Sequence, residues 1–154
     1  ECLGCFRDFR VLFIEPGSES DFLAISNRID LLEKLITLLR EKGFRTVVIG
    51  VHHAGSTIPI LEDSGIKIDG YLTPINRLGV MMFPNKDLAV KAVRNTGKPV
   101  IAIKTMAGGR IPPFKAFDYI FGEVGVDACM IGVGSVKEAG EDFSIAKKVV
   151  EKYS

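Results

Sequence analysis

Residues 29–51 read IDLLEKLITLLREKGFRTVVIGV, a helix pattern followed directly by a strand pattern. Apolar residues recur at helical spacing at Ile29, Leu32, Ile36 and Leu39. Lys42 and Gly43 then form a typical helix end. A strand is predicted at 45–51 (RTVVIGV), because its residues 47–51 are a continuous apolar run rich in β-branched side chains, which indicates burial on both faces. The segment therefore predicts a helix packed against a buried strand.

The same alternation occurs along the whole chain. Strands are predicted at 10–15, 45–51, 70–74, 99–104 and 128–133, with starts 35, 25, 29 and 29 residues apart. Helices are predicted at 29–42, 56–64, 85–94 and 114–123, with a last one after Ser135, whose Glu138 completes a capping box. Strands separated by helices must pair in parallel, so the sequence predicts an α/β fold.

Two architectures fit five βα units of about 31 residues each. One is an open doubly wound sheet, and the other is the C-terminal part of a (βα)₈ barrel. The chain starts at Glu1 without a Met, so we expect residues 1–154 to be one domain and a fragment of a larger barrel. Open parallel edges would then pair with the missing N-terminal half or with another copy in an oligomer.

Composition narrows the class of partner. The 154 residues are 47% hydrophobic and 25% charged, with a net charge of +1, which argues against nucleic acid or an anionic membrane as a partner. Three cysteines and the lack of a signal peptide or long apolar run favour a cytoplasmic location. Cys2 and Cys5 have the spacing of half a metal or redox site but are interpreted as packing residues, and Cys129 as core. The lack of Trp and Gln fits a heat-adapted protein.

Functional residues are expected where the strands end, because the βα loops of either architecture gather at that edge. Two loops there are rich in glycine, whose backbone N–H groups can approach an anion. Their candidate phosphate-binding residues are Gly108, Gly109, Arg110, Gly134 and Ser135. The alternative is that the glycines only form tight turns.

Acid/base candidates follow three other strands. They are Glu15, His53 and Lys104. A lysine desolvated at a barrel mouth has a lowered pKa and can form a Schiff base or move a proton. Alternatively, Lys104 forms a structural ion pair with Glu15 or Asp69. His52 and His53 are adjacent and lack a metal-ligand spacing, so no metal site is predicted.

Several motifs, in this order, resemble the C-terminal half of the aldo/keto reductase superfamily, from its fourth strand to its eighth. The segments are FRVLFIEP (9–16), EKLITLLREKGFRTVVIGVHHA (33–54), GYLTPINRLG (70–79), PVIAIKTMAGG (99–109) and MIGVGSVKEAGED (130–142). The resemblance implies a (βα)₈ barrel that reduces carbonyl compounds with NADP. It also implies that cofactor phosphates bind near the last two strands and that Asn76 contacts the cofactor.

The chain departs from this family at the reactive end. Glu15 stands where the resemblance expects the catalytic His, and His52 and His53 stand where it expects Ser and Asn. Leu72 replaces the Gln of the sixth strand, and Ile103 replaces the aromatic residue that stacks on nicotinamide. The resemblance therefore implies a divergent protein that binds a phosphate-bearing cofactor or substrate.

A second resemblance gives an alternative. IKTMAGGRI (103–111) and ACMIGVGS (128–135) are similar to the last two strands of class I aldolases of the deoxyribose-phosphate kind. This likeness implies cleavage of phosphorylated aldehydes, with Lys104 as the amine that forms or tunes a Schiff base. A third possibility is a barrel remnant that binds or assembles without catalysis.

Overall fold

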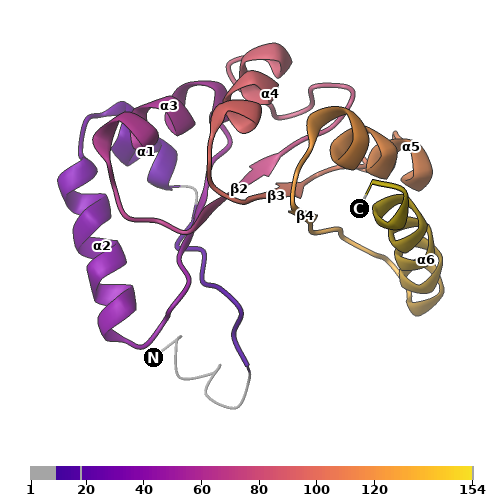
Figure 1. Ribbon diagram of the computed structural model, residues 1–154, viewed down its shortest axis with the longest axis horizontal. Coiled ribbons are helices and arrows are strands. Elements are labelled where there is room, and N and C mark those ends of the chain that lie inside the picture. The colour runs from indigo at the N-terminus through magenta and orange to yellow at the C-terminus, as the bar shows by residue number, and fades with distance from the viewer. Residues whose placement is uncertain (1–9, 18, 154) are drawn as a thin grey trace.

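The computed structural model describes residues 10–17 and 19–153 and has a mixed α/β fold built on one parallel sheet (Figure 1). The strands are β1 (Val48–Gly50), β2 (Gly70–Pro74), β3 (Val100–Ile103) and β4 (Ala128–Cys129). They lie side by side in chain order, and all three pairings are parallel. The prediction of an α/β fold with a parallel sheet is confirmed.

Helices separate the strands as predicted, with one addition. They are α1 (Glu19–Ile25), α2 (Ile29–Glu41), α3 (Ala54–Ser64), α4 (Lys86–Asn95), α5 (Pro113–Phe117), η2 (Asp118–Val124) and α6 (Val136–Tyr153). The predicted helix at 114–123 is α5 continued by the π-helix η2. The short helix α1 was not predicted from the sequence.

The helix ends predicted at Gly43, Asn85 and Ser135 are found in the structure. Gly43 follows α2 with φ of 95°, a conformation that costs glycine little. The side chain of Asn85 accepts a hydrogen bond from the N–H of Leu88 and so caps α4. Before α6, the Ser135 hydroxyl accepts a hydrogen bond of 3.1 Å from the N–H of Glu138. The predicted N-terminal boundaries of these elements are therefore correct to within one residue.

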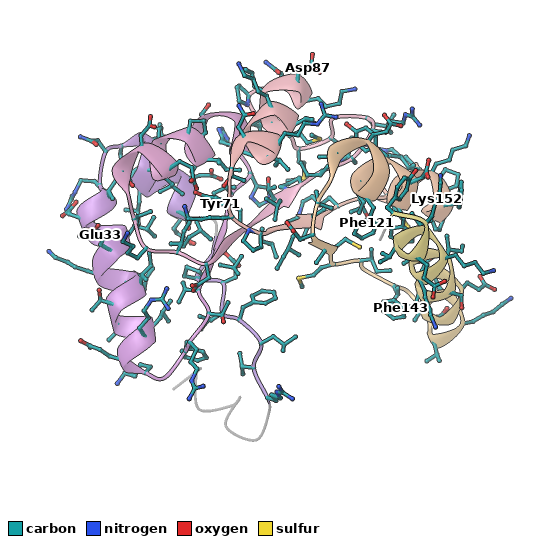
Figure 2. All side chains as sticks on the ribbon, viewed as in Figure 1. Glu33, Tyr71, Asp87, Phe121, Phe143 and Lys152 are labelled. Atoms are coloured by element: carbon teal, nitrogen blue, oxygen red, sulfur yellow. The ribbon has the colours of Figure 1, made fainter. Side chains whose placement is uncertain are left out.

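The core lies between the sheet and the helices. The strand side chains facing the helices include Ile49, Tyr71, Val100 and Ala102, all of them buried. Register explains this face, because Ile49 pairs with Tyr71 and Tyr71 pairs with Val100. Figure 2 shows Tyr71 inside the molecule, where it belongs to this core.

The opposite face of the sheet carries no helix from the described residues. Figure 1 shows the helices along one side and at the two ends, so that the elements form an arch. The bare face presents Leu72, Ile101 and Ile103, which are partly buried. Met130, which follows β4, keeps half of its surface exposed. An apolar sheet face normally packs against another layer of secondary structure, so this exposed face is a candidate contact surface.

Four of the five predicted strands are shorter than expected. β1 is Val48–Gly50 rather than 45–51, and β3 is Val100–Ile103 rather than 99–104. Residues 10–15 form only an isolated parallel bridge between Ile14 and Val47, next to β1. β4 ends at Cys129, and the last hydrogen bond along it joins the N–H of Met130 to the carbonyl of Ala102. Because β3 turns away at Lys104, whose φ is 54°, residues 131–133 have no strand to pair with.

Within the described residues, none of the helices combines the length and apolar character needed to cross a membrane. Cys2 and Cys5 lie outside the described residues. Cys129 is half-buried against the core, and burial raises the pKa of its thiol.

Candidate functional site

The loop between β3 and α5, residues 104–112, is the best-formed feature at the carboxyl edge of the sheet. Four of its residues have positive φ: Lys104 (54°), Ala107 (50°), Gly108 (70°) and Gly109 (81°). For Lys104 and Ala107 this left-handed backbone is costly, and residues so held cluster at functional sites. The turn is closed by hydrogen bonds from Ala107 N–H to Lys104 O (2.9 Å) and from Ile111 N–H to Met106 O (3.1 Å).

Part of this loop is buried in a small apolar cluster. It consists of Ala107, Ile111 and Ala116, with Val80 and Met106 packed against it. Val80 comes from the loop after β2, so the two neighbouring loops share one cluster. The loop is therefore fixed at both ends while residues 108–110 remain exposed.

The exposed part of the loop offers hydrogen-bond donors to solvent. Within residues 10–17 and 19–153, the N–H groups of Gly108, Gly109 and Arg110 have no acceptor. A side chain added at Gly108 or Gly109 would meet no atom within 4 Å. The charged ends of Lys104 and Arg110 form no ion pair or hydrogen bond in the described part of the chain. Successive N–H groups without an acceptor, next to two cations, form a set of donors that an anion can accept.

The second predicted phosphate loop is arranged differently. The N–H of Gly134 donates a hydrogen bond of 2.6 Å to Oε2 of Glu138, and the hydroxyl of Ser135 caps Glu138. The Gly134 N–H therefore already binds a carboxylate of the same chain, while the Ser135 hydroxyl acts as the acceptor that caps α6. The capping box at Ser135 and Glu138 was predicted correctly, but the local sequence did not reveal that the Glu138 carboxylate would take the Gly134 N–H.

Asn76 lies at the carboxyl end of β2 and is fully buried. Its side-chain amide donates to Val80 O and its side-chain oxygen accepts from Val80 N–H, both at 2.9 Å. These two bonds shape the loop after β2. The amide of Asn76 is thus engaged within its own loop, and its assignment to cofactor binding stays a prediction.

The three acid/base candidates occupy separate positions on this edge. Oε1 of Glu15 accepts from Gly17 N–H at 2.7 Å, and its carboxylate lies against Gly50 of β1. The imidazole of His53 stacks on Phe83, with ring centroids 4.9 Å apart and planes tilted by 33°. Lys104 is exposed. No hydrogen bond or ion pair joins any two of the three among the described residues.

The structural alternative for Lys104, an ion pair with Glu15 or Asp69, is not found among the described residues. Asp69 lies at the amino end of β2, where its Oδ2 binds Arg40 at 3.0 Å and the N–H of Val47 at 2.7 Å. Lys104 follows the carboxyl end of β3. In a parallel sheet these two ends lie on opposite edges, so Lys104 and Asp69 cannot form an ion pair.

Asp21 is the residue that sequence reasoning missed. It lies on α1, is buried, and accepts from the N–H of His52 at 2.6 Å and from the hydroxyl of Thr57 at 2.6 Å. The N–H of His53, the residue before α3, also points at this carboxylate at 3.2 Å. Asp21 therefore neutralises the positive end of α3, which begins two residues earlier than predicted. Acidic residues directly before the apolar run at 22–25 were the available signal.

Asp21 also lines a surface cavity of about 430 Å³ with Phe22, Ile25, His52 and His53. Its carboxylate is saturated by the three donors just described, so it is held as part of the scaffold. Among the described residues no group of three or more His, Cys, Asp or Glu side chains is placed to hold a metal ion.

A scan against protein-family models and searches of curated proteins and of solved structures find no match to this chain.

Proposed function

We propose that this chain binds a phosphate-bearing small molecule at the loop 104–110. The observation that carries the proposal is the run of three N–H groups at Gly108, Gly109 and Arg110 that have no acceptor in the described part of the chain. A phosphate oxygen accepts hydrogen bonds from such donors well. Lys104 and Arg110 supply two positive charges to the same loop.

The proposal places the anion on the loop itself rather than on the helix that follows. α5 has five residues and starts with Pro113, preceded by Pro112, and proline has no N–H to donate. The binding energy must therefore come from the loop backbone and the two cations. The positive φ values at 107–109 belong to the same turn, in which the N–H groups of Gly108, Gly109 and Arg110 find no acceptor among the described residues.

NADP is the cofactor that the sequence resemblance implies, and the residues fit only one part of it. The loop 104–110 suits any one of its phosphoryl groups. The nicotinamide end lacks partners, because Leu72 and Ile103 are apolar and occupy the positions expected to contact the ring and its amide. We derive no hydride transfer from these residues, and NADP enters the proposal as a ligand to be tested.

The aldolase alternative requires a lysine whose pKa is lowered by desolvation. Lys104 is exposed, so the structure does not show the desolvated position that this alternative requires. Binding without catalysis is compatible with the same loop geometry and is distinguished by the lack of turnover.

We further propose that the arch is part of a closed (βα)₈ barrel. Support comes from strands that follow in chain order and from helices that lie on one face of the sheet only (Figure 1). Barrel interiors are filled by branched apolar side chains, and Leu72, Ile101 and Ile103 on the bare face are of this type. When only this chain is present, a second copy of it would have to supply the strands that close the barrel.

Calorimetric titration of the chain with inorganic phosphate, NADPH and NADH at low ionic strength tests the binding proposal. We expect Arg110→Ala to weaken phosphate binding about tenfold, as for a charge-assisted hydrogen bond worth about 1.4 kcal/mol. Lys115→Ala is the matched control, since it removes an exposed cation from α5 without touching the loop. Equal losses in both variants, or no binding of any ligand at millimolar concentration, would overturn the proposal.

A further inference from the structure

A surface cavity of about 530 Å³ lies between α4 and η2, which are neighbours in the helix layer (Figure 1). Its lining is mostly charged or polar and includes Lys86, Asp87, Lys91 and Arg94 from α4, and Tyr119 and Glu123 from η2. Residues 104–110 do not line it. The cavity is therefore separate from the phosphate site proposed above.

Direct contacts hold the side chains around this cavity together. Arg77, from the loop after β2, pairs with Oε1 of Glu123 at 3.0 Å. Its guanidinium carbon also lies over the ring of Tyr119, 5.8 Å from the centroid. Arg94 donates to the carbonyl oxygen of Glu123, and Lys86 donates to the carbonyl oxygen of Arg77 at 3.4 Å. Side chains of α4, η2 and the β2 loop thus meet at one place.

The charges around the cavity do not balance. Arg77 neutralises the carboxylate of Glu123. The three cations that α4 contributes to the lining form no ion pair in the described part of the chain, and Asp87 supplies one carboxylate against them. Two positive charges are left over, and an uneven charge of this kind in a concave surface concentrates anions.

Tyr119 adds a second, independent observation. It is only 7% exposed, and its hydroxyl has no hydrogen-bond partner among residues 10–17 and 19–153. Burial, with the charge of Glu123 as the next cause, raises the pKa of Tyr119, so the hydroxyl keeps its proton at neutral pH. Buried tyrosine hydroxyls usually find a partner. Here a donor without an acceptor lines the same cavity as the unpaired cations.

We propose that this cavity binds a small dianion, whose carboxylate or phosphoryl oxygens accept hydrogen bonds from the hydroxyl of Tyr119 and the ammonium group of Lys91. The volume lies in the range of small-molecule sites. Tyr119 stands on a π-helix, a turn that occurs frequently at functional sites. Charge-assisted hydrogen bonds from a phenol and an ammonium group to one anion are of the strong kind.

Two variants test the donors separately. Tyr119→Phe removes the hydroxyl and breaks no hydrogen bond found in the described residues, so the thermal midpoint should stay unchanged while anion binding weakens. Lys91→Gln removes one exposed cation of the lining. Lys148→Gln is its matched control, because Lys148 is an exposed cation on α6 that forms no ion pair in the described part of the chain. Circular dichroism melts verify that all three variants fold.

The test is calorimetric titration of the whole chain and its variants with succinate and with methyl phosphate at low ionic strength. We expect at least one probe to bind, about tenfold more weakly in Tyr119→Phe, as for a hydrogen bond to a charged group. Lys91→Gln should weaken it about threefold, and Lys148→Gln by less than about 1.5-fold. The two probes distinguish a carboxylate ligand from a phosphoryl ligand.

Arg110→Ala separates this site from the loop 104–110. Binding that weakens in Tyr119→Phe and Lys91→Gln but not in Arg110→Ala supports the inference, whatever the fate of the proposed function. Binding that weakens only in Arg110→Ala belongs to the loop and overturns the inference while supporting the proposed function. The inference also fails if neither probe binds at millimolar concentration, if Tyr119→Phe binds as tightly as the unmodified chain, or if Lys91→Gln and Lys148→Gln lose affinity equally.

Discussion

The carboxylate of Asp21 on α1 accepts a hydrogen bond of 2.6 Å from the hydroxyl of Thr57 on α3, 36 residues later in the chain. The same carboxylate receives the N–H groups of His52 and His53. One buried anion therefore joins the first helix, the carboxyl end of β1 and the start of α3. The short helix α1 exposes Phe22 but is joined to the rest of the fold by this group and by Ala24, which is buried in the core.

Removing this anion is expected to destabilise the fold. Asp21→Ala leaves three donors without their acceptor and should lower the free energy of unfolding by about 3 kcal/mol. Thr57→Val should cost about 1.5 kcal/mol, and the double variant less than the sum, because both changes break the same bond. Urea denaturation measures all three. Glu33→Ala, which alters a solvent-facing residue of α2 (Figure 2), should leave the midpoint unchanged.

A second prediction concerns Glu62 and pH. Burial alone would raise the pKa of Glu62, but hydrogen bonds from Lys98 (2.8 Å) and Tyr71 (2.5 Å) outweigh it and lower this pKa. A lowered folded-state pKa gives stability that is present above the unfolded value of about 4.3 and is lost as the pH falls through the folded value. We expect the free energy of unfolding to fall less steeply in Glu62→Gln than in the unmodified chain between about pH 5 and pH 3.

Tyr71 provides the alkaline counterpart. Burial, with Glu62 as the hydrogen-bond acceptor, raises the pKa of Tyr71 above its ordinary value. A raised folded-state pKa gives stability that is present below the unfolded value of about 10 and is lost as the pH rises toward the folded value. Tyr71→Phe should cost about 1 kcal/mol at neutral pH and abolish this alkaline loss. Denaturant titration at several alkaline pH values measures the free energy of unfolding of both chains. The same decline in Tyr71→Phe as in the unmodified chain would contradict the role given to Tyr71.

The contact between η2 and the end of α6 predicts that two Gly→Ala substitutions change the stability of the fold in opposite directions. A Cβ on Gly122 would overlap the ring of Tyr153, whose hydroxyl donates to Asp118 at 2.7 Å. Gly122→Ala should therefore destabilise by about 1 kcal/mol. Gly140→Ala, in α6 with no atom within 4 Å of the new carbon, should stabilise by about 0.5–1 kcal/mol.

Removing the tyrosine checks the cause of this effect. In a Tyr153→Ala background the clash is gone, so Gly122→Ala should become neutral or stabilising. If Gly122→Ala still lowered the stability by the same amount in this background, the strain would lie in the backbone of η2 instead.

The bare sheet face leads to a prediction about assembly. If a second copy covers this face, light scattering after size exclusion should show a mass above 16.8 kDa, and Met130→Lys should shift it toward the monomer. Leu38→Lys is the control, since Leu38 on α2 is exposed to 48%, close to the 50% of Met130, but faces away from the sheet. A monomeric unmodified chain would contradict closure by a second copy.

Local patterns predicted most of the secondary structure correctly. Helical spacing in 29–41, the Asn85 cap and the capping box at Ser135 depend on residues a few positions apart, so the sequence alone contains them. β2 was located at 70–74 to the residue. Strand length was less accessible, because β4 ends where β3 turns away, and that turn belongs to a different part of the chain.

In the candidate site, too, local features could be predicted from the sequence, whereas contacts between distant residues could not. Glycine content alone led to the prediction that backbone N–H groups of the loops at 108–110 and 134–135 can approach an anion. Whether those donors are free depends on neighbours in space: Glu138 fills one loop, and nothing in the described residues fills the other. Asp21 reaches β1 and α3 only after the chain has folded, because its partners lie 31 to 36 residues away. Short-range periodicity is thus a property of the sequence, whereas the pairing of a donor with its acceptor required the tertiary structure.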